Sequence, residues 1–212
     1  MEAPSLPPVS AYATRSTLHE TREALIRLAK AAEVSERFED MRVFLRDVVV
    51  MGIPLTIEER HMLATAYKNV IGALRAAFRM LVNDNGPAYS ESMHQYRMHI
   101  ATELDSVCNE ALFLTKTHLL KTAADPSSQV YYLKQAGDYH RYLAEIPWSQ
   151  GHPEGAHQCY ESAFKIARAH LQPADPVRLG LALNYSVCAF DIFRRQDLAT
   201  SIARTSFDEV DL

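Results

Sequence analysis

The chain has 212 residues, of which 48% are hydrophobic and only 7 are glycine. Its net charge of -4 and pI near 6.1 argue against nucleic acid as the main partner, because a phosphate-tracking surface normally makes a domain basic. No apolar run approaches the roughly 20 residues of a membrane span, and the amino terminus lacks the apolar segment of a signal peptide. We therefore expect a cytoplasmic protein, whose location could extend to the nucleus.

Hydrophobic residues recur every three or four positions along most of the chain, and strand-like alternation is absent, which predicts an all-α protein. Residues 1–18 hold several prolines and small polar residues and predict a flexible tail. Residues 19–212 are expected to form a single helical domain. About eight helices with short, antiparallel connections are expected, over residues 17–35, 36–52, 57–83, 90–122, 127–148, 153–171 and 176–195 and from 197 onward.

The helix that begins at Ile57 has the clearest signals. Thr56 and Glu59 form a capping-box pair, which marks a helix start. Farther along, Arg75 and Arg79 each fall within about 20° of Lys68 on a helical wheel. These three cations share one ridge beside the apolar face. They are either splayed into water as an ordinary solvated flank or arranged around an anion.

A second polar stripe is expected on the helix over residues 127–148. Lys134, Asp138, Arg141 and Tyr142 follow one another at i, i+4, i+7 and i+8, which places Asp138 within reach of both cations. Asp138 could hold their side chains extended. An exposed salt-bridge ladder explains the same spacing equally well.

No catalytic or metal-binding motif is found. Cys108, Cys159 and Cys188 are odd in number and widely spaced, so we expect small core residues in a reducing compartment. The 9 histidines show no metal-binding spacing such as HExxH, and no CxxC pair occurs. Neither a nucleophile elbow nor a glycine-rich phosphate loop is present. We therefore expect no metal, no cofactor and no enzymatic activity.

Five segments stand in an order that points to one family. They are RFEDM at 37–41, AYKNVIGA at 66–73, YYLKQAGDYHRYLAE at 131–145, DPVRLGLALNYSVCAFDI at 175–192 and SIARTSFDE at 201–209. Together they resemble the 14-3-3 proteins, from about residue 22 to Leu212. The resemblance implies an antiparallel helical array, with right-handed packing like that of tetratricopeptide repeats. It also implies a dimer that holds segments phosphorylated on serine or threonine in an amphipathic groove.

The family's functional residues have counterparts in this sequence. Lys68, Arg75, Arg141 and Tyr142 match its phosphate pocket, where two guanidinium forks, an ammonium and a hydroxyl suit a phosphate group. Asn184 matches an asparagine that grips the bound peptide's backbone. Periodicity alone would place Leu183 and Val187 in the core, whereas the resemblance places them on the apolar groove wall. The other expected groove positions are Arg79, Lys134, Gly180 and Asp191, the last in place of a glutamate.

Two departures from the family pattern are expected to matter. The chain ends at Leu212, and the family's ninth helix has no counterpart before that point. We therefore expect weaker and more salt-sensitive phosphopeptide binding than in a complete relative. At the dimer interface, Arg37, Glu103 and Tyr96 match the family, but the partner of Asp40 is His99 in place of lysine. Because a free histidine is mostly neutral at pH 7.4, dimerisation is expected to tighten modestly as the pH falls.

The leading hypothesis is a dimeric adaptor, homo- or heterodimeric, that binds phosphoserine or phosphothreonine segments of client proteins without catalysis. The alternative is a helical scaffold that assembles proteins but has weakened or lost phosphopeptide binding, because the C-terminal helix is absent. Neither hypothesis involves nucleic acid or a membrane span.

Overall fold

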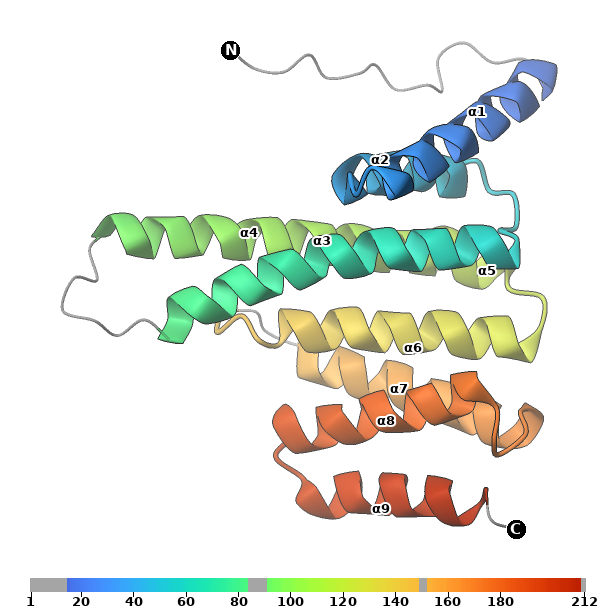
Figure 1. Ribbon diagram of the computed structural model, residues 1–212. Helices are drawn as coiled ribbons and strands as arrows, with labels where there is room; N and C mark the ends of the chain where they lie inside the picture. The colour runs from blue at the N-terminus through green and yellow to red at the C-terminus, as the bar shows by residue number, and fades with distance from the viewer. Residues whose placement is uncertain (1–14, 84–90, 149–151, 211–212) are drawn as a thin grey trace. The chain divides into compact units, whose positions relative to one another are not determined.

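The computed structural model describes residues 15–83, 91–148 and 152–210, and within these ranges it contains helices and no strand (Figure 1). The all-α class expected from the sequence is confirmed. The chain divides into two compact units, residues 1–70 and 71–212. The expected tail over residues 1–18 lies outside the described residues up to position 14, and residues 15–18 belong to the first helix. The single domain over residues 19–212 stays a prediction.

The first unit contains α1 (Arg15–Val34), α2 (Phe38–Val50) and the beginning of α3 (Ile57–Asn83). The buried side chains of α2 are Met41, Leu45, Val48 and Val49, whose spacing places them on one face of the helix. Leu25 and Ala29 of α1 are buried as well. Burial of these apolar faces stabilises the unit.

The expected capping box at the start of α3 is confirmed. The Thr56 backbone N–H donates to Glu59 Oε2 at 2.8 Å, and the Glu59 N–H donates to Thr56 Oγ1 at 3.2 Å. The Glu59 carboxylate also accepts from Arg22 Nη2 of α1 at 2.8 Å. Burial raises the pKa of Glu59, but the hydrogen bonds from Arg22 and Thr56 outweigh it, so the pKa is lowered overall. One carboxylate therefore starts α3 and ties it to α1.

The second unit holds the end of α3 and the remaining helices. They are α4 (Glu91–Leu114), the π-helix η2 (Thr115–Leu119), α5 (Leu120–Thr122), α6 (Pro126–Leu143), α7 (His152–His170), α8 (Pro176–Asp191) and α9 (Gln196–Asp208). From α6 to α9, successive helices run in alternating directions (Figure 1). Since α4, η2 and α5 are continuous, the described ranges form eight helices in all, as expected.

The π-helical turn in the long helix was not expected from the sequence. Thr115 lies at its start, and its hydroxyl donates to the Ala111 carbonyl at 2.8 Å. The Thr117 hydroxyl likewise donates to the Phe113 carbonyl at 2.6 Å. Such side-chain bonds to the preceding turn compete with the backbone ladder, and hydrophobic periodicity does not reveal the wider turn.

Two expected helix boundaries around α6 were wrong. Asp125 and Pro126 do not close the preceding helix but open α6, where the Asp125 carboxylate caps the Ser128 N–H at 2.8 Å and proline occupies the first turn. At its other end, α6 stops at Leu143 rather than at Pro147. Glu145 therefore lies in the turn after the helix, where its N–H donates to the Tyr142 carbonyl at 3.2 Å.

The core of the second unit depends on small side chains of α7. Ala156, Tyr160, Ala163 and Ala167 are fully buried and follow at i, i+4, i+7 and i+11, which places them on one helix face. Tyr160 stacks on Tyr185 of α8, with ring centroids 5.4 Å apart. The three alanines allow neighbouring helices to come close to the α7 backbone.

The cysteines agree largely with expectation, since all three are free, Cys108 and Cys188 are buried and Cys159 is half-buried. Burial raises the pKa of the Cys108 thiol to about 12, which keeps it protonated. None of the described helices combines the length and the hydrophobicity needed to cross a lipid bilayer.

Replacing Gly137 of α6 should destabilise the protein. A Cβ atom at this position would lie 2.6 Å from Tyr160 Cε1. The Tyr160 ring is fully buried and cannot move away from this clash. We expect Gly137→Ala to lower the free energy of unfolding by about 1–3 kcal/mol, measured by urea denaturation. Gly72→Ala is the control, because a Cβ at Gly72 meets nothing within 4 Å. It should raise stability by about 0.5–1 kcal/mol, and equal shifts for both variants would contradict the packing argument.

A histidine pair between α6 and α7 should make stability depend on pH. The Nδ1 atoms of His140 and His152 lie 3.1 Å apart, and burial, followed by the neighbouring His152, lowers the pKa of His140. On acidification, the unfolded chain takes up a proton near the ordinary histidine pKa that folded His140 resists. Stability should therefore fall between pH 7.5 and pH 5.5 and should be unaffected by this group above that range.

The test compares urea midpoints of the wild type and His140→Gln at several pH values. The stability of His140→Gln should fall less toward low pH than that of the wild type. His61→Gln removes an exposed histidine and serves as the control. Parallel pH curves for the wild type and His140→Gln would contradict the proposed coupling.

Candidate anion-binding site

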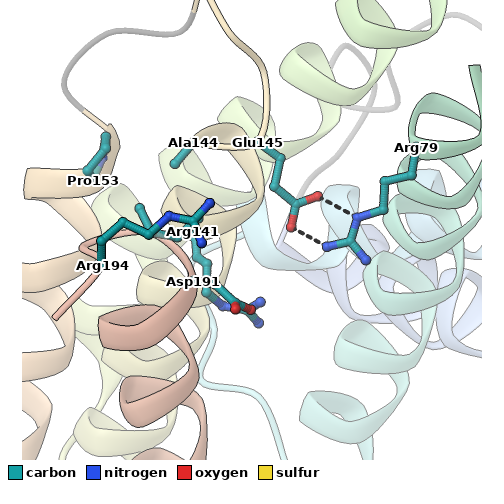
Figure 2. Close-up of a pocket in the computed structure, with 8 residues that line it drawn as sticks. Arg79, Arg141, Ala144, Glu145, Pro153, Asp191 and Arg194 are labelled. Atoms are coloured by element: carbon teal, nitrogen blue, oxygen red, sulfur yellow. Dashed lines mark hydrogen bonds and ion pairs between the residues drawn. The ribbon is translucent and has the colours of Figure 1, made fainter. Parts of the chain in front are cut away.

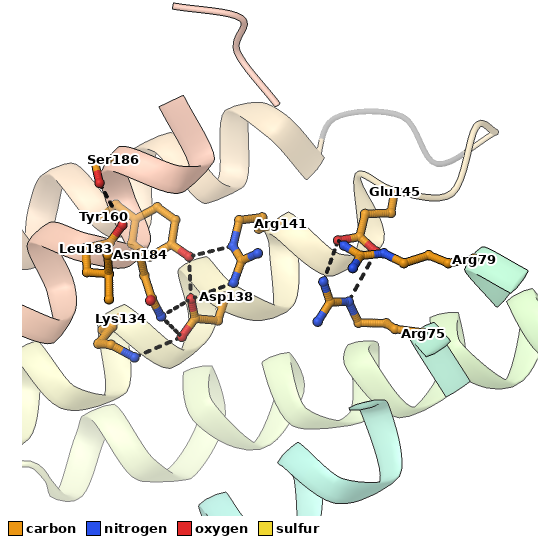
Figure 3. Close-up of polar contacts among 10 residues, drawn as sticks. All are labelled: Arg75, Arg79, Lys134, Asp138, Arg141, Glu145, Tyr160, Leu183, Asn184 and Ser186. Atoms are coloured by element: carbon orange, nitrogen blue, oxygen red, sulfur yellow. Dashed lines mark hydrogen bonds and ion pairs between the residues drawn. The ribbon is translucent and has the colours of Figure 1, made fainter. Parts of the chain in front are cut away.

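The candidate site lies in the second unit, where α3, α6, α7 and α8 contribute polar side chains (Figure 3). Arg75 and Arg79 come from α3, one helical turn apart, and Arg141 and Tyr142 come from the last turn of α6. Glu145 follows in the turn after α6. Helix periodicity directs the two arginines of α3 to the same side, and the early end of α6 leaves Glu145 outside the helix.

Glu145 binds both arginines of α3. Its Oε1 and Oε2 accept from Arg75 Nη2 at 2.6 Å and Nε at 3.2 Å, and from Arg79 Nη2 at 2.7 Å and Nε at 3.2 Å. Both contacts are two-pronged, which fixes the planes of the guanidinium groups. The side chains of Arg75 and Glu145 are only 17% and 14% exposed, whereas that of Arg79 is 58% exposed. Two of the three ridge cations, Arg75 and Arg79, thus hold an anion that belongs to the protein itself.

Arg75 and Arg141 converge on one aromatic ring. The guanidinium carbons of Arg75 and Arg141 lie 3.8 Å and 4.7 Å from the centroid of the Tyr142 ring, within the range of cation–π contacts. Burial raises the pKa of Tyr142, so its hydroxyl is a neutral hydrogen-bond donor at physiological pH. Two cations and one hydroxyl therefore share a small volume.

Asp138 is the centre of a buried polar network. It accepts from Lys134 Nζ at 3.0 Å, Tyr160 Oη at 2.5 Å, Asn184 Nδ2 at 2.8 Å and Arg141 Nη2 at 3.5 Å. Only 7% of Asp138 is exposed. The expectation that Asp138 reaches both cations is confirmed, and the alternative of an exposed salt-bridge ladder is wrong. The carboxylate links α6 to α7 and α8.

The charge of Arg141 is secured by this network. Burial lowers the pKa of Arg141, but the neighbouring Tyr160, Asp138 and Tyr142 outweigh the effect, so the pKa is raised overall. Arg141 Nε also donates to Tyr160 Oη at 3.4 Å. Both polar contacts of Arg141 are long, and a guanidinium group has five N–H donors. The side chain is thus charged, oriented and able to bind a further acceptor.

The exposed face of α8 carries an apolar strip beside a polar one. Leu183 is 63% exposed and Val187 is 37% exposed, so their placement in the core by periodicity alone is wrong. Leu179 and Phe190 continue the strip at i−4 and i+7 from Leu183. Asn184, Gly180 and Asp191 flank it, and a Cβ at Gly180 would lie 3.7 Å from Lys134 Cε. The surface is amphipathic.

A cavity of about 490 Å³ opens at this site (Figure 2). It brings together residues of α3, the end of α6, the start of α7 and the end of α8. They are Arg79, Arg141, Ala144, Glu145, Pro153, Asp191, Ile192 and Arg194.

Three residues of the site were not foreseen from the sequence. The sequence pattern predicts Glu145 inside a helix, and its offset of four from Arg141 indicates a shared face. Tyr160 resembles an ordinary core aromatic, since only its hydroxyl takes part in the network. The sequence predicts Arg194 near the end of a helix over residues 176–195, whereas α8 stops at Asp191.

The remaining expected residues lie elsewhere or make local contacts. Lys68 is exposed on α3 but belongs to the first unit, and its part in the site stays a prediction. No three His, Cys, Asp or Glu side chains gather as a metal site would require, as far as the described ranges extend.

The charged or titratable residues expected at the dimer interface are exposed or half-buried, and each pairs with a neighbour in the same segment. Arg37 forms an ion pair with Asp40 at the start of α2. On α4, His99 Nε2 lies 3.4 Å from Glu103 Oε1, and Tyr96, one turn earlier, is 53% exposed. Each pair combines a cationic or titratable group with a carboxylate at the surface.

Comparison with known proteins agrees with these features. The family model of the 14-3-3 protein matches residues 28–211. The chain is 38% identical to 14-3-3 protein zeta of Bombyx mori, over 89% of this chain and 79% of that protein. It is 37% identical to 14-3-3 protein beta/alpha-B of Xenopus laevis, over 89% and 80%, and 42% identical to 14-3-3-like protein GF14 omega of Arabidopsis thaliana, over 89% and 77%.

The match includes α6 and α8 and the cluster of cations that they help to build. The chain therefore belongs to the 14-3-3 family, whose members are non-enzymatic adaptors that bind phosphorylated proteins.

Proposed function

We propose that this protein binds client segments phosphorylated on serine or threonine, and that Arg75, Arg141 and Tyr142 hold the phosphate group. The observation that carries the proposal is the convergence of two guanidinium groups on the neutral Tyr142 ring. A phosphate group brings a charge of about -1.5 to -2 and three acceptor oxygens. The two guanidinium groups and the Tyr142 hydroxyl can each donate to one of these three oxygens.

The anchoring carboxylates favour such binding. Glu145 and Asp138 hold the arginine side chains in place before any ligand arrives, so little side-chain entropy remains to be lost on binding. A dianionic phosphate also competes well with a single carboxylate for the same guanidinium groups, because charge-assisted hydrogen bonds strengthen with charge. The carboxylates therefore orient the arginine side chains but do not cancel the positive charge of the site.

Lys68 completes the proposed phosphate pocket. It lies seven residues before Arg75 on α3, which is two helical turns and nearly the same angular position. Its side chain is exposed, and its ammonium group would add a third positive charge. The support for this residue is the family resemblance together with the shared helix face.

The α8 surface would hold the peptide on either side of the phosphate. The Asn184 amide nitrogen is already engaged by Asp138, which leaves the amide oxygen to accept from a backbone N–H of the client. Leu183 and Val187 would bury apolar side chains of the same segment. Lys134, packed over Gly180, holds Asp138 from the other side.

A pair of peptides tests the proposal. We expect a phosphoserine peptide to bind at least ~100-fold tighter than its unphosphorylated twin, since one or two charge-assisted hydrogen bonds suffice for such a ratio. Fluorescence anisotropy would measure both affinities. Lys68→Glu should abolish the difference, because it inverts a charge beside the phosphate.

The control is Lys116→Glu, which inverts an exposed cation on η2 and should leave the ratio unchanged. Equal affinity of the wild type for both peptides would overturn the phosphate-binding proposal. In that event, the scaffold function without phosphopeptide binding becomes the better account.

We also propose that the protein works as a dimer in which surface ion pairs exchange partners. In the single chain, Arg37 pairs with Asp40 and His99 with Glu103. In the dimer, Arg37 would pair with Glu103 of the partner subunit, and Asp40 would face His99 of the partner subunit. The exposed ring of Tyr96 would add apolar contact at the same surface.

Charge reversal tests the dimer contact. Arg37→Glu places an acidic side chain opposite Glu103 of the partner subunit and should weaken dimerisation at least ~10-fold, because like charges at an interface repel. Adding Glu103→Arg restores opposite charges and should recover most of the loss. Analytical ultracentrifugation at matched ionic strength would measure the dissociation constants. Additive effects of the two changes would argue against a direct contact.

A further inference from the structure

Arg194 has an unusual backbone conformation at the end of α8. Its φ is 55°, in the left-handed region that side chains other than Asn and Gly rarely adopt. Glycine or asparagine is the common residue where a chain leaves a helix in this way. An arginine in this conformation carries backbone strain, and such strain points to a role for its side chain.

The Arg194 side chain lines the same cavity as Arg79 and Arg141 (Figure 2). Arg79 is bound by Glu145, and Arg141 contacts Asp138 and Tyr160. Among the residues that the structure describes, Arg194 makes no hydrogen bond and no ion pair. Its guanidinium group can therefore offer all of its N–H donors to a ligand.

The charges around the cavity also leave room for an added anion. The lining cations are Arg79, Arg141 and Arg194, and the lining carboxylates are Glu145 and Asp191. Glu145 is already shared by Arg75 and Arg79, so it does not neutralise Arg194. A volume of about 490 Å³ is also in the range of sites that hold more than one functional group.

We infer that Arg194 recognises a second anionic group of the same client, an acidic side chain close to the phosphorylated residue. This inference rests on the proposed function, because the phosphate bound by Arg75 and Arg141 brings the client to the cavity. In an extended peptide, residues i and i+2 point to the same side and lie about 7 Å apart. An acidic residue two positions from the phosphoserine would thus face the same cavity and meet Arg194.

The experiment uses two phosphoserine peptides and their unphosphorylated twins. One peptide has glutamate two positions before and two positions after the phosphoserine, and the other has glutamine at both positions. Replacing glutamate with glutamine removes the negative charge and leaves the size of the side chain almost unchanged. Fluorescence anisotropy would measure their affinities for the full chain and its variants.

Arg194→Asn is the test variant, because asparagine tolerates the left-handed conformation and should preserve folding. It should weaken binding of the glutamate phosphopeptide about fivefold, as expected for loss of a partly exposed ionic contact. It should change binding of the glutamine phosphopeptide less than twofold. Arg204→Asn removes an exposed cation of α9 outside the cavity and should affect both peptides alike. Arg194→Lys, which keeps the charge, should recover part of the preference.

Two failures can be told apart. If Arg194→Asn weakens both phosphopeptides equally, or neither of them, the role of Arg194 is overturned while the phosphate site stands. If the wild type does not prefer either phosphopeptide over its unphosphorylated twin, the proposed function is overturned, and the role of Arg194 with it.

Discussion

The polar architecture of the second unit depends on one buried carboxylate. Asp138 is 7% exposed and accepts hydrogen bonds from side chains of α6, α7 and α8. Burying a carboxylate is strongly unfavourable unless cations and donors surround it. Lys134, Tyr160 and Asn184 supply these partners, and in doing so they lose their freedom to rotate. The buried carboxylate of Asp138 thereby fixes the side chains that surround it at the rim of the site.

Glu145 plays a similar part at the opposite edge. It holds two arginines of α3 that would otherwise repel one another. Carboxylates on both sides thus allow several cations to stand close together in the absence of a ligand. A phosphate bound as proposed would meet cations that are already oriented, so little of its binding energy would be spent on ordering them.

The sequence predicted much of the framework and less of the network. Helix periodicity and the capping pair at Thr56 and Glu59 predicted the helices, because both depend on local spacing. The spacing of Lys134, Asp138 and Arg141 indicated one stripe but did not decide whether it is buried. Tyr160 and Asn184 decide it, and they come from α7 and α8, so only the tertiary packing reveals them. Leu183 and Val187 were predicted in the core from periodicity but are exposed, since an apolar period does not distinguish a core face from an exposed apolar face.

The alanine-rich face of α7, although it is apolar, has a consequence for the buried polar network. Because Ala156, Ala163 and Ala167 have methyl side chains only, the helix backbone sits deep enough for the Tyr160 hydroxyl to meet the Asp138 carboxylate. A bulkier residue at one of these alanines would push the α7 axis outward and stretch that bond. The spacing between the α6 and α7 axes, set by the smallest side chains of the core, thus helps to determine how firmly Tyr160 and Asp138 hold the Arg141 side chain.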